Sequence, residues 1–113
     1  MPFIHVRVGK SFSERQERDL ATRLGQAVEV VPNKTYEKTM VVVDECRLYR
    51  GGQLSESVLL ETRFNEEILF EHKQAFTAKA YEIVESVLGV PSDQMYVNYL
   101  ELVRNWGSRG ELK

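Results

Sequence analysis

The chain has 113 residues, of which 42% are hydrophobic and 28% are charged. This length and composition predict one domain over residues 1–113, because two independent cores would each be marginal at this size. The formal net charge of −2 lacks the basic excess that binding to nucleic acids or anionic membrane surfaces requires. We therefore expect no nucleic-acid partner and no membrane partner.

Cysteine usage and the amino-terminal segment indicate a cytoplasmic protein. Cys46 is the only cysteine, so no intrachain disulfide can form, and a lone thiol suits a reducing compartment. No apolar run reaches the roughly 18 residues of a membrane helix, and the chain does not start with a basic segment followed by an apolar one. The small side chain of Pro2 favours removal of Met1, which would make Pro2 the mature amino terminus.

The first half of the chain predicts a strand, a helix and a second strand. Residues 3–8 alternate and include β-branched side chains, as a strand does. Residues 13–16, Ser-Glu-Arg-Gln, form a capping box that opens a helix, which the Pro32–Asn33 pair ends. Residues 39–43 predict the next strand, which leads to a turn at Gly51–Gly52. The helix carries an apolar stripe at Leu20, Leu24, Ala27, Val28 and Val31.

The second half, residues 57–113, repeats the order of the first, residues 1–56, and the two halves align without a gap. A strand is predicted over residues 58–64, a helix from about residue 66 to residue 88, and a last strand over residues 95–102. The second helix has its own apolar stripe at Phe76, Ala80, Ile83, Val84 and Val87.

These elements predict an α+β fold built from a tandem β-α-β repeat. A strand-helix-strand connection of this length favours parallel pairing, and right-handed crossovers place both helices on the same face of one four-stranded mixed sheet. The opposite face, which nothing in the chain covers, would carry Phe3, His5, Arg7, Leu59, Glu61 and Arg63. Such a mixed polar and apolar face suits burial against other subunits, so we expect a homo-oligomer.

Three features together resemble the tautomerase superfamily, in particular the proteins similar to macrophage migration inhibitory factor and 4-oxalocrotonate tautomerase. They are Pro2 directly before a strand, the β-α-β repeat, and the segment Met95-Tyr96-Val97-Asn98-Tyr99. The tail with Trp106 and Gly107 and the turn at Gly51–Gly52 match as well. The resemblance covers nearly the whole chain and implies a homotrimer with active sites at the subunit boundaries.

The resemblance also implies an activity. It indicates a tautomerase, an isomerase that moves a proton between the enol and keto forms of a small, phenylpyruvate-like 2-oxo acid, without a cofactor or a metal. The general base would be the nitrogen of Pro2, a secondary amine that loses proton affinity when it is desolvated or placed near cations. No spacing of His, Cys or carboxylate residues resembles a metal site.

Five further residues are candidates for binding the substrate. Lys34, and less closely Lys38, match the family lysine that follows the first helix. Arg63 offers a planar guanidinium that can grip the expected substrate carboxylate with two hydrogen bonds. Tyr96 and Asn98 lie two residues apart on one strand face, so both can reach one site as hydrogen-bond donors.

Two other functions compete with this one. The first is a decarboxylase or hydratase that resembles malonate semialdehyde decarboxylase: Arg63 matches one of that family's arginines, Asn65 stands in place of a second, and Glu37 lies near the position of its acidic residue. The second is a non-catalytic trimeric binding protein. Retention of Met1 would favour the binding protein, because the nitrogen of Pro2 would then be a non-basic amide.

Overall fold

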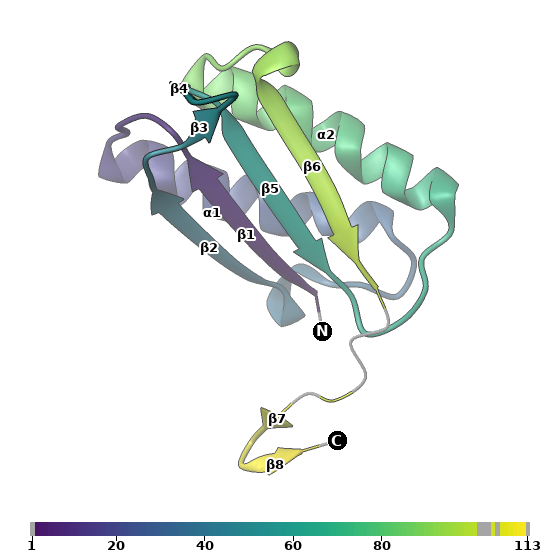
Figure 1. Ribbon diagram of the computed structural model, residues 1–113. Coiled ribbons are helices and arrows are strands. Elements are labelled where there is room, and N and C mark those ends of the chain that lie inside the picture. Colours follow the sequence, from purple (N-terminus) through teal and green to yellow (C-terminus); the bar gives the residue numbers. More distant parts are fainter. Residues whose placement is uncertain (1, 102–104, 106, 113) are drawn as a thin grey trace.

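The computed structural model describes residues 2–101, 105 and 107–112. Its centre is a four-stranded sheet in the order β2-β1-β5-β6. Helices α1 and α2 lie side by side on one face of this sheet and leave the other face open (Figure 1). The main elements are β1 (Phe3–Val8), α1 (Glu14–Ala27), β2 (Met40–Glu45), β5 (Val58–Arg63), α2 (Phe70–Leu88) and β6 (Met95–Leu100). The predicted α+β class and the placement of both helices are confirmed.

Strand pairing follows the predicted repeat. Each half forms one parallel pair, β1 with β2 and β5 with β6, and the halves join through the antiparallel pair of β1 and β5. The register places Phe3 opposite Met40 on one side and opposite Arg63 on the other. The start of β1 therefore lies beside the start of β2 and the end of β5, at one end of the sheet.

The core lies between the sheet and the two helices, because alternate strand residues and one stripe of each helix are apolar. Ile4, Val6 and Val8 of β1 are fully buried against the helices. The helices contribute the predicted residues Leu20, Leu24, Ala27 and Val28 from the first stripe, and Phe76, Ala80, Ile83 and Val84 from the second. None of the described helices is long and apolar enough to cross a membrane.

The first helix begins where its sequence predicts. Ser13 Oγ accepts a hydrogen bond from the Gln16 backbone N–H at 3.1 Å, and Gln16 Oε1 accepts one from the Ser13 backbone N–H at 2.8 Å. The predicted capping box is therefore present. The predicted helix extended as far as Pro32, whereas α1 ends at Ala27 and its last turn tightens into the 3₁₀ helix η1 (Val28–Val30).

The second helix begins later than predicted, at Phe70 instead of near residue 66. The reason is the burial of Ile68, which packs with Val31 and Phe64 in a small cluster at the end of the sheet. Leu69 then takes an extended conformation, with φ −60° and ψ 141°, before α2 starts. Burial of one apolar side chain at the sheet end thus overrides the helical pattern of the four residues before Phe70.

Short hairpins and single turns complete the chain. Gly51 and Gly52 have φ of 57° and 78°, and they form the predicted turn between β3 (Tyr49–Arg50) and β4 (Gln53–Leu54). Strands β7 (Gly107–Ser108) and β8 (Glu111–Leu112) form a second hairpin that extends away from the sheet (Figure 1). Two 3₁₀ turns precede β2 and β6, namely η2 (Tyr36–Lys38) and η3 (Ser92–Gln94). The last strand, predicted over residues 95–102, ends at Leu100; Glu101 follows it outside the strand, and residue 102 lies outside the described residues.

Candidate active site

Pro2 lies buried at the end of the sheet, directly before β1. Its carbonyl oxygen accepts a hydrogen bond from the Met40 backbone N–H at 3.1 Å. Because Phe3 pairs with Arg63 in the antiparallel register, Pro2 lies level with Phe64 on the neighbouring strand. The backbone at Pro2 is thus held by β2 through its carbonyl, and the next residue, Phe3, is paired with β5.

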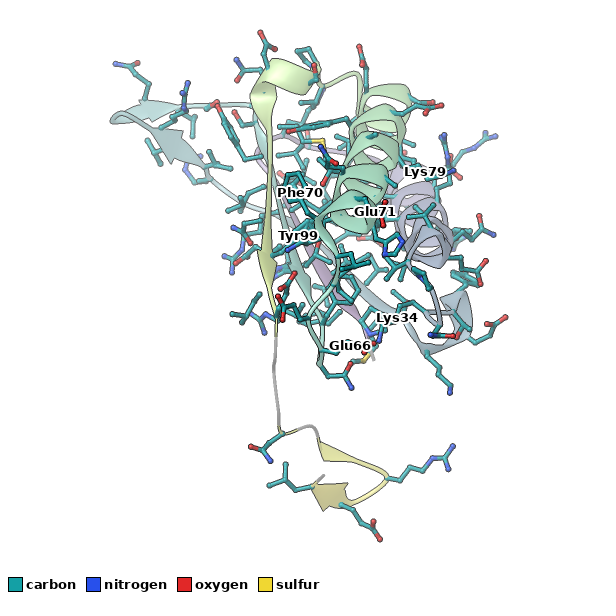
Figure 2. The ribbon with its side chains drawn as sticks, turned by 90° about the vertical axis from the view of Figure 1, so that its right-hand side faces the viewer. Lys34, Glu66, Phe70, Glu71, Lys79 and Tyr99 are labelled. Carbon is teal, nitrogen blue, oxygen red and sulfur yellow. The ribbon has the colours of Figure 1, made fainter. Side chains whose placement is uncertain are left out.

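Lys34 is anchored at the same end of the sheet. Its backbone N–H donates to the carbonyl of Val31 at 3.2 Å, and Val31 packs on Phe64, which is level with Pro2. The side chain of Lys34 is only 9% exposed, and its Nζ donates a hydrogen bond to Glu66 Oε1. Figure 2 shows these two side chains meeting at the end of the molecule from which the C-terminal hairpin extends. The lysine predicted from the sequence is therefore already paired with a carboxylate.

Glu66 was not among the residues predicted from the sequence. It follows β5, in the loop that buries Ile68. The hydrogen bond from Lys34, together with the positive charge of its ammonium, holds the pKa of Glu66 below its ordinary value of 4.5. Glu66 is consequently charged at neutral pH. No local motif signals this pair, because 32 residues separate its partners.

We expect the ion pair to stabilise the fold only while Glu66 is ionised. Since the folded-state pKa is lowered, the contribution to the free energy of unfolding is fully present above pH 4.5 and is lost as the pH falls through the folded-state value. Urea unfolding at fixed protein concentration should therefore show wild type to be more stable than Glu66→Gln at neutral pH. The difference should shrink as the pH falls below 4.5.

Glu67→Gln is the matched control for this measurement. Glu67 is exposed and has no ion pair among the described residues, so its variant should show no such pH-dependent difference from wild type. An equal stability difference between wild type and Glu66→Gln at acid and neutral pH would contradict the prediction.

Arg63 ends β5 on the open face of the sheet, opposite Phe3. Its guanidinium carbon lies 5.3 Å from the centroid of the Phe3 ring. Within the described part of the chain, no carboxylate forms an ion pair with it. Arg63 thus presents an unpaired planar cation next to the residue that follows Pro2. A carboxylate could accept two hydrogen bonds from it.

Lys38 is the most exposed of the predicted basic residues. It ends η2, two residues before Met40, whose N–H binds the Pro2 carbonyl. No side-chain partner of Lys38 is found among the residues that the structure describes. Lys38 therefore lies in solvent at the same end of the sheet as Pro2.

Tyr96 and Asn98 are not near Pro2 in the same chain. They lie on β6 opposite Leu59 and Glu61, on the open face, two residues apart as predicted. Phe64, which is level with Pro2, is five residues along β5 from Leu59, and this separation corresponds to about 17 Å along the strand. A small substrate at Pro2 therefore cannot also reach Tyr96 of its own chain.

The open face also carries a network of charges that the sequence reasoning did not identify. His5 Nε2 and Asp44 Oδ2 are 2.7 Å apart, and Arg7 Nε donates to Glu61 Oε1 at 2.7 Å. The predicted residues of β1 and β5 do lie on this face. In the sequence, charged residues at alternate positions of both strands indicate this face. Which of these charges pair is decided only by the register of the strands.

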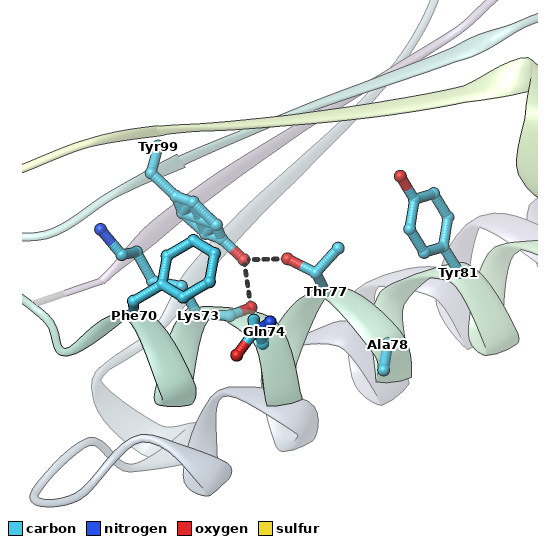
Figure 3. A pocket seen from close by; sticks show the side chains of 7 residues that line it. All are labelled: Phe70, Lys73, Gln74, Thr77, Ala78, Tyr81 and Tyr99. Atoms are coloured by element: carbon cyan, nitrogen blue, oxygen red, sulfur yellow. Dashed lines mark hydrogen bonds between the residues drawn. The ribbon is translucent and has the colours of Figure 1, made fainter.

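A separate groove of about 480 Å³ lies between α2 and β6 (Figure 3). Tyr99 points into it from β6, where its hydroxyl donates to the Lys73 carbonyl at 3.0 Å and lies 2.6 Å from Thr77 Oγ1. Burial raises the pKa of Tyr99 above its ordinary value of 10.0, so the phenol stays protonated at neutral pH. The groove is lined by Phe70, Lys73, Gln74, Thr77, Ala78, Tyr81 and Tyr99. None of the six predicted site residues lines it.

Comparison with solved structures identifies the fold. The chain is similar to Leishmania major MIF2, with 17% sequence identity and a TM-score of 0.89, over 100% of this chain and 97% of the other. A macrophage migration inhibitory factor-like protein from Entamoeba histolytica gives 16% identity and 0.87, over 99% and 98%. Wild-type fused 4-OT gives 18% identity and 0.85, over 96% and 94%. No family model and no curated protein matches the sequence.

The chain therefore has the fold of the tautomerase superfamily, as the resemblance in its sequence implied. Its likeness to these structures extends over nearly the whole chain in both directions. Among the described residues, no group of three His, Cys, Asp or Glu side chains is placed to hold a metal ion.

Proposed function

We propose that this protein is a tautomerase that interconverts the enol and keto forms of a small 2-oxo acid, with the nitrogen of Pro2 as general base after removal of Met1. The observation that carries the proposal is the position of Pro2, which is buried, bonded to β2 through its carbonyl, and followed directly by the paired strand β1. Arg63 lies opposite Phe3 at the same end of the sheet, and its guanidinium has no carboxylate partner among the described residues. A poised base and an open cation are what this proton transfer on a carboxylate substrate needs.

The reaction uses one proton and the electrons of the substrate. The neutral nitrogen of Pro2 takes the proton of the enol hydroxyl, and the O–H electron pair becomes the second bond of the carbonyl. The C=C electron pair then forms a C–H bond with the proton that the Pro2 ammonium returns to C3. Desolvation disfavours the charged form of an amine, which is the property that a base working near neutral pH needs.

The binding groups come from two subunits of a homotrimer in this proposal. Arg63 holds the substrate carboxylate, while Tyr96 and Asn98 of a neighbouring subunit donate hydrogen bonds to the reacting oxygen. Three observations support the assembly. Within one chain Tyr96 lies too far from Pro2 to contact the same small substrate, the open face exposes Met40, Val42 and Leu100, and the fused 4-OT structure is an asymmetric trimer.

The class of substrate is supported by one structural neighbour. The structure named Pt0534, which is 18% identical with a TM-score of 0.85, was obtained after inactivation by 2-oxo-3-pentynoate. That compound is a 2-oxo acid whose triple bond is conjugated to the ketone, so a nucleophilic amine can add to it. We propose the cytoplasm as the location of the activity.

Labelling with 2-oxo-3-pentynoate tests whether the Pro2 nitrogen is a free, nucleophilic amine. We expect mass spectrometry to find one adduct per chain, located on Pro2, and the loss of activity to follow its formation. The control is a chain with one alanine inserted between Met1 and Pro2, which makes the Pro2 nitrogen an amide and should prevent labelling of Pro2. A chain that ketonises enols at full rate after labelling at another residue would contradict the proposal.

Two assays separate the competing functions. Ketonisation of enol-phenylpyruvate, followed by its ultraviolet absorbance, reports the tautomerase. Release of carbon dioxide from a 3-oxo acid without enol ketonisation would indicate the decarboxylase instead. A protein that does neither, and that retains Met1 in its intact mass, would be a binding protein.

A further inference from the structure

The buried cation near Pro2 is not free to bind a substrate. The side chain of Lys34 is 9% exposed, and its ammonium is bound by Glu66, whose side chain is 57% exposed. The two loops that carry the pair are held together by the contacts of Val31, Phe64 and Ile68. Glu66 is therefore the solvent-exposed partner of a largely buried ammonium, and its carboxylate occupies that ammonium.

The cations at this end of the sheet are therefore not equally available to a substrate carboxylate. Lys34 and Glu66 neutralise each other, whereas Arg63 faces the open side of the sheet without a carboxylate partner among the described residues. One substrate carboxylate can pair with Arg63. A second carboxylate directed at Lys34 would meet the charge of Glu66, and like charges in close contact oppose binding.

We infer that Glu66 is a specificity-determining residue, which restricts the site to 2-oxo acids with a single carboxylate by occupying the ammonium of Lys34. The inference rests on the proposed function, because it concerns the substrate class of that same site. Glu66 acts through Lys34 and the local charge, and it takes no part in the proton transfer.

Neighbouring side chains offer a matched control. Glu66 and Glu67 both line a small pocket of about 140 Å³ between the two loops. Only Glu66 is paired with Lys34; Glu67 has no ion pair in the described part of the chain. Glu67→Gln removes the same formal charge from the adjacent position, so a difference between the two variants reports the contact with Lys34 and excludes an effect of net charge alone.

Relative turnover of two enols tests the inference. We would measure kcat/KM for enol-phenylpyruvate, with one carboxylate, and for enol-oxaloacetate, with two. Glu66→Gln should raise the ratio of the second value to the first about tenfold, as one removed like charge near a half-exposed site predicts. Glu67→Gln should leave the ratio within about twofold of wild type, because exposed charges that touch nothing contribute little. Equal ratios in wild type and Glu66→Gln would overturn the inference.

Equilibrium binding separates this inference from the proposed function. The probes are 2-oxobutanoate and 2-oxoglutarate, which carry one and two carboxylates, and their dissociation constants can be measured by calorimetry without any turnover. Tighter binding of 2-oxoglutarate relative to 2-oxobutanoate in Glu66→Gln, in a protein that ketonises no enol, would support the inference while the proposed function fails. An unchanged ratio in an active enzyme would overturn the inference alone.

A reciprocal variant guards against a loss of local structure in the Glu66 loop. Lys34→Gln leaves Glu66 without its partner and should weaken the binding of 2-oxoglutarate more than that of 2-oxobutanoate. The two variants thus shift the ratio in opposite directions, which a general loosening of the loop would not do. A shift in the same direction in both would contradict the role given to Glu66.

Discussion

Replacement of Pro2 by alanine should lower kcat/KM for enol ketonisation about a hundredfold, because a positioned general base contributes between about 10² and 10⁴ in rate. Alanine is small, so Met1 is still expected to be removed and an amine remains. That amine is no longer part of a ring that fixes its direction at the start of β1, where Met40 holds the backbone. The measurement is the initial rate with enol-phenylpyruvate, with intact mass to establish the amino terminus of each protein.

The control for this prediction keeps the proline and removes its basicity. In the chain with an alanine inserted before Pro2, the ring is present but its nitrogen is an amide. The loss should then reach the upper part of the range, about ten-thousandfold, because no amine is left at that position. Ketonisation by Pro2→Ala at the wild-type rate would exclude Pro2 as the base, whatever the inserted variant does.

Mixing two inactive variants should restore activity if each site is built from two subunits. Pro2→Ala lacks the positioned proline base, and Tyr96→Phe with Asn98→Ala lacks the donors. When equal amounts are unfolded together and refolded, random assembly gives an intact base facing intact donors at about one quarter of the sites of a cyclic trimer. We therefore expect about a quarter of the wild-type rate from two preparations that are each nearly inactive.

This outcome depends on the geometry of a single chain. Tyr96 is level with Leu59, while Pro2 is level with Phe64. The separation of about 17 Å along the strands is too long for one small substrate to span. The control is the same mixture of native proteins without unfolding, which should stay inactive for as long as subunits do not exchange. No recovery after refolding into well-formed trimers would show that Tyr96 and Asn98 serve no site that crosses a subunit boundary.

Much of the fold was predictable because its signals are local. Alternation along residues 3–8 reflects the two faces of a strand, and the Ser13–Gln16 capping box satisfies backbone donors within one turn. The Gly51–Gly52 pair is at positive φ, which few other residues adopt readily. The repeat then determined the pairing of strands, because two similar β-α-β units with right-handed crossovers fit one sheet in few ways.

The departures from prediction come from contacts between distant segments. The sequence around residue 66 has a helical pattern, yet α2 starts at Phe70 because Ile68 is buried against Phe64 and Val31. Lys34, which the sequence offered as a substrate-binding residue, also has a carboxylate partner that the sequence did not indicate, Glu66. In both cases the deciding partner is remote in sequence, so no local period or motif reports it.

By itself, the sequence determined the elements, their order, the helical face of the sheet and the identity of the terminal base candidate Pro2. These depend on side-chain periodicity, capping and turn residues, which act over a few positions of the chain. Only the tertiary structure decided which of the predicted cations is paired with a carboxylate, namely Lys34, and that Tyr96 lies too far from Pro2 to serve the same chain. Which charges pair, and how far apart two residues of different strands lie, depends on distances in space. The register of the sheet sets those distances.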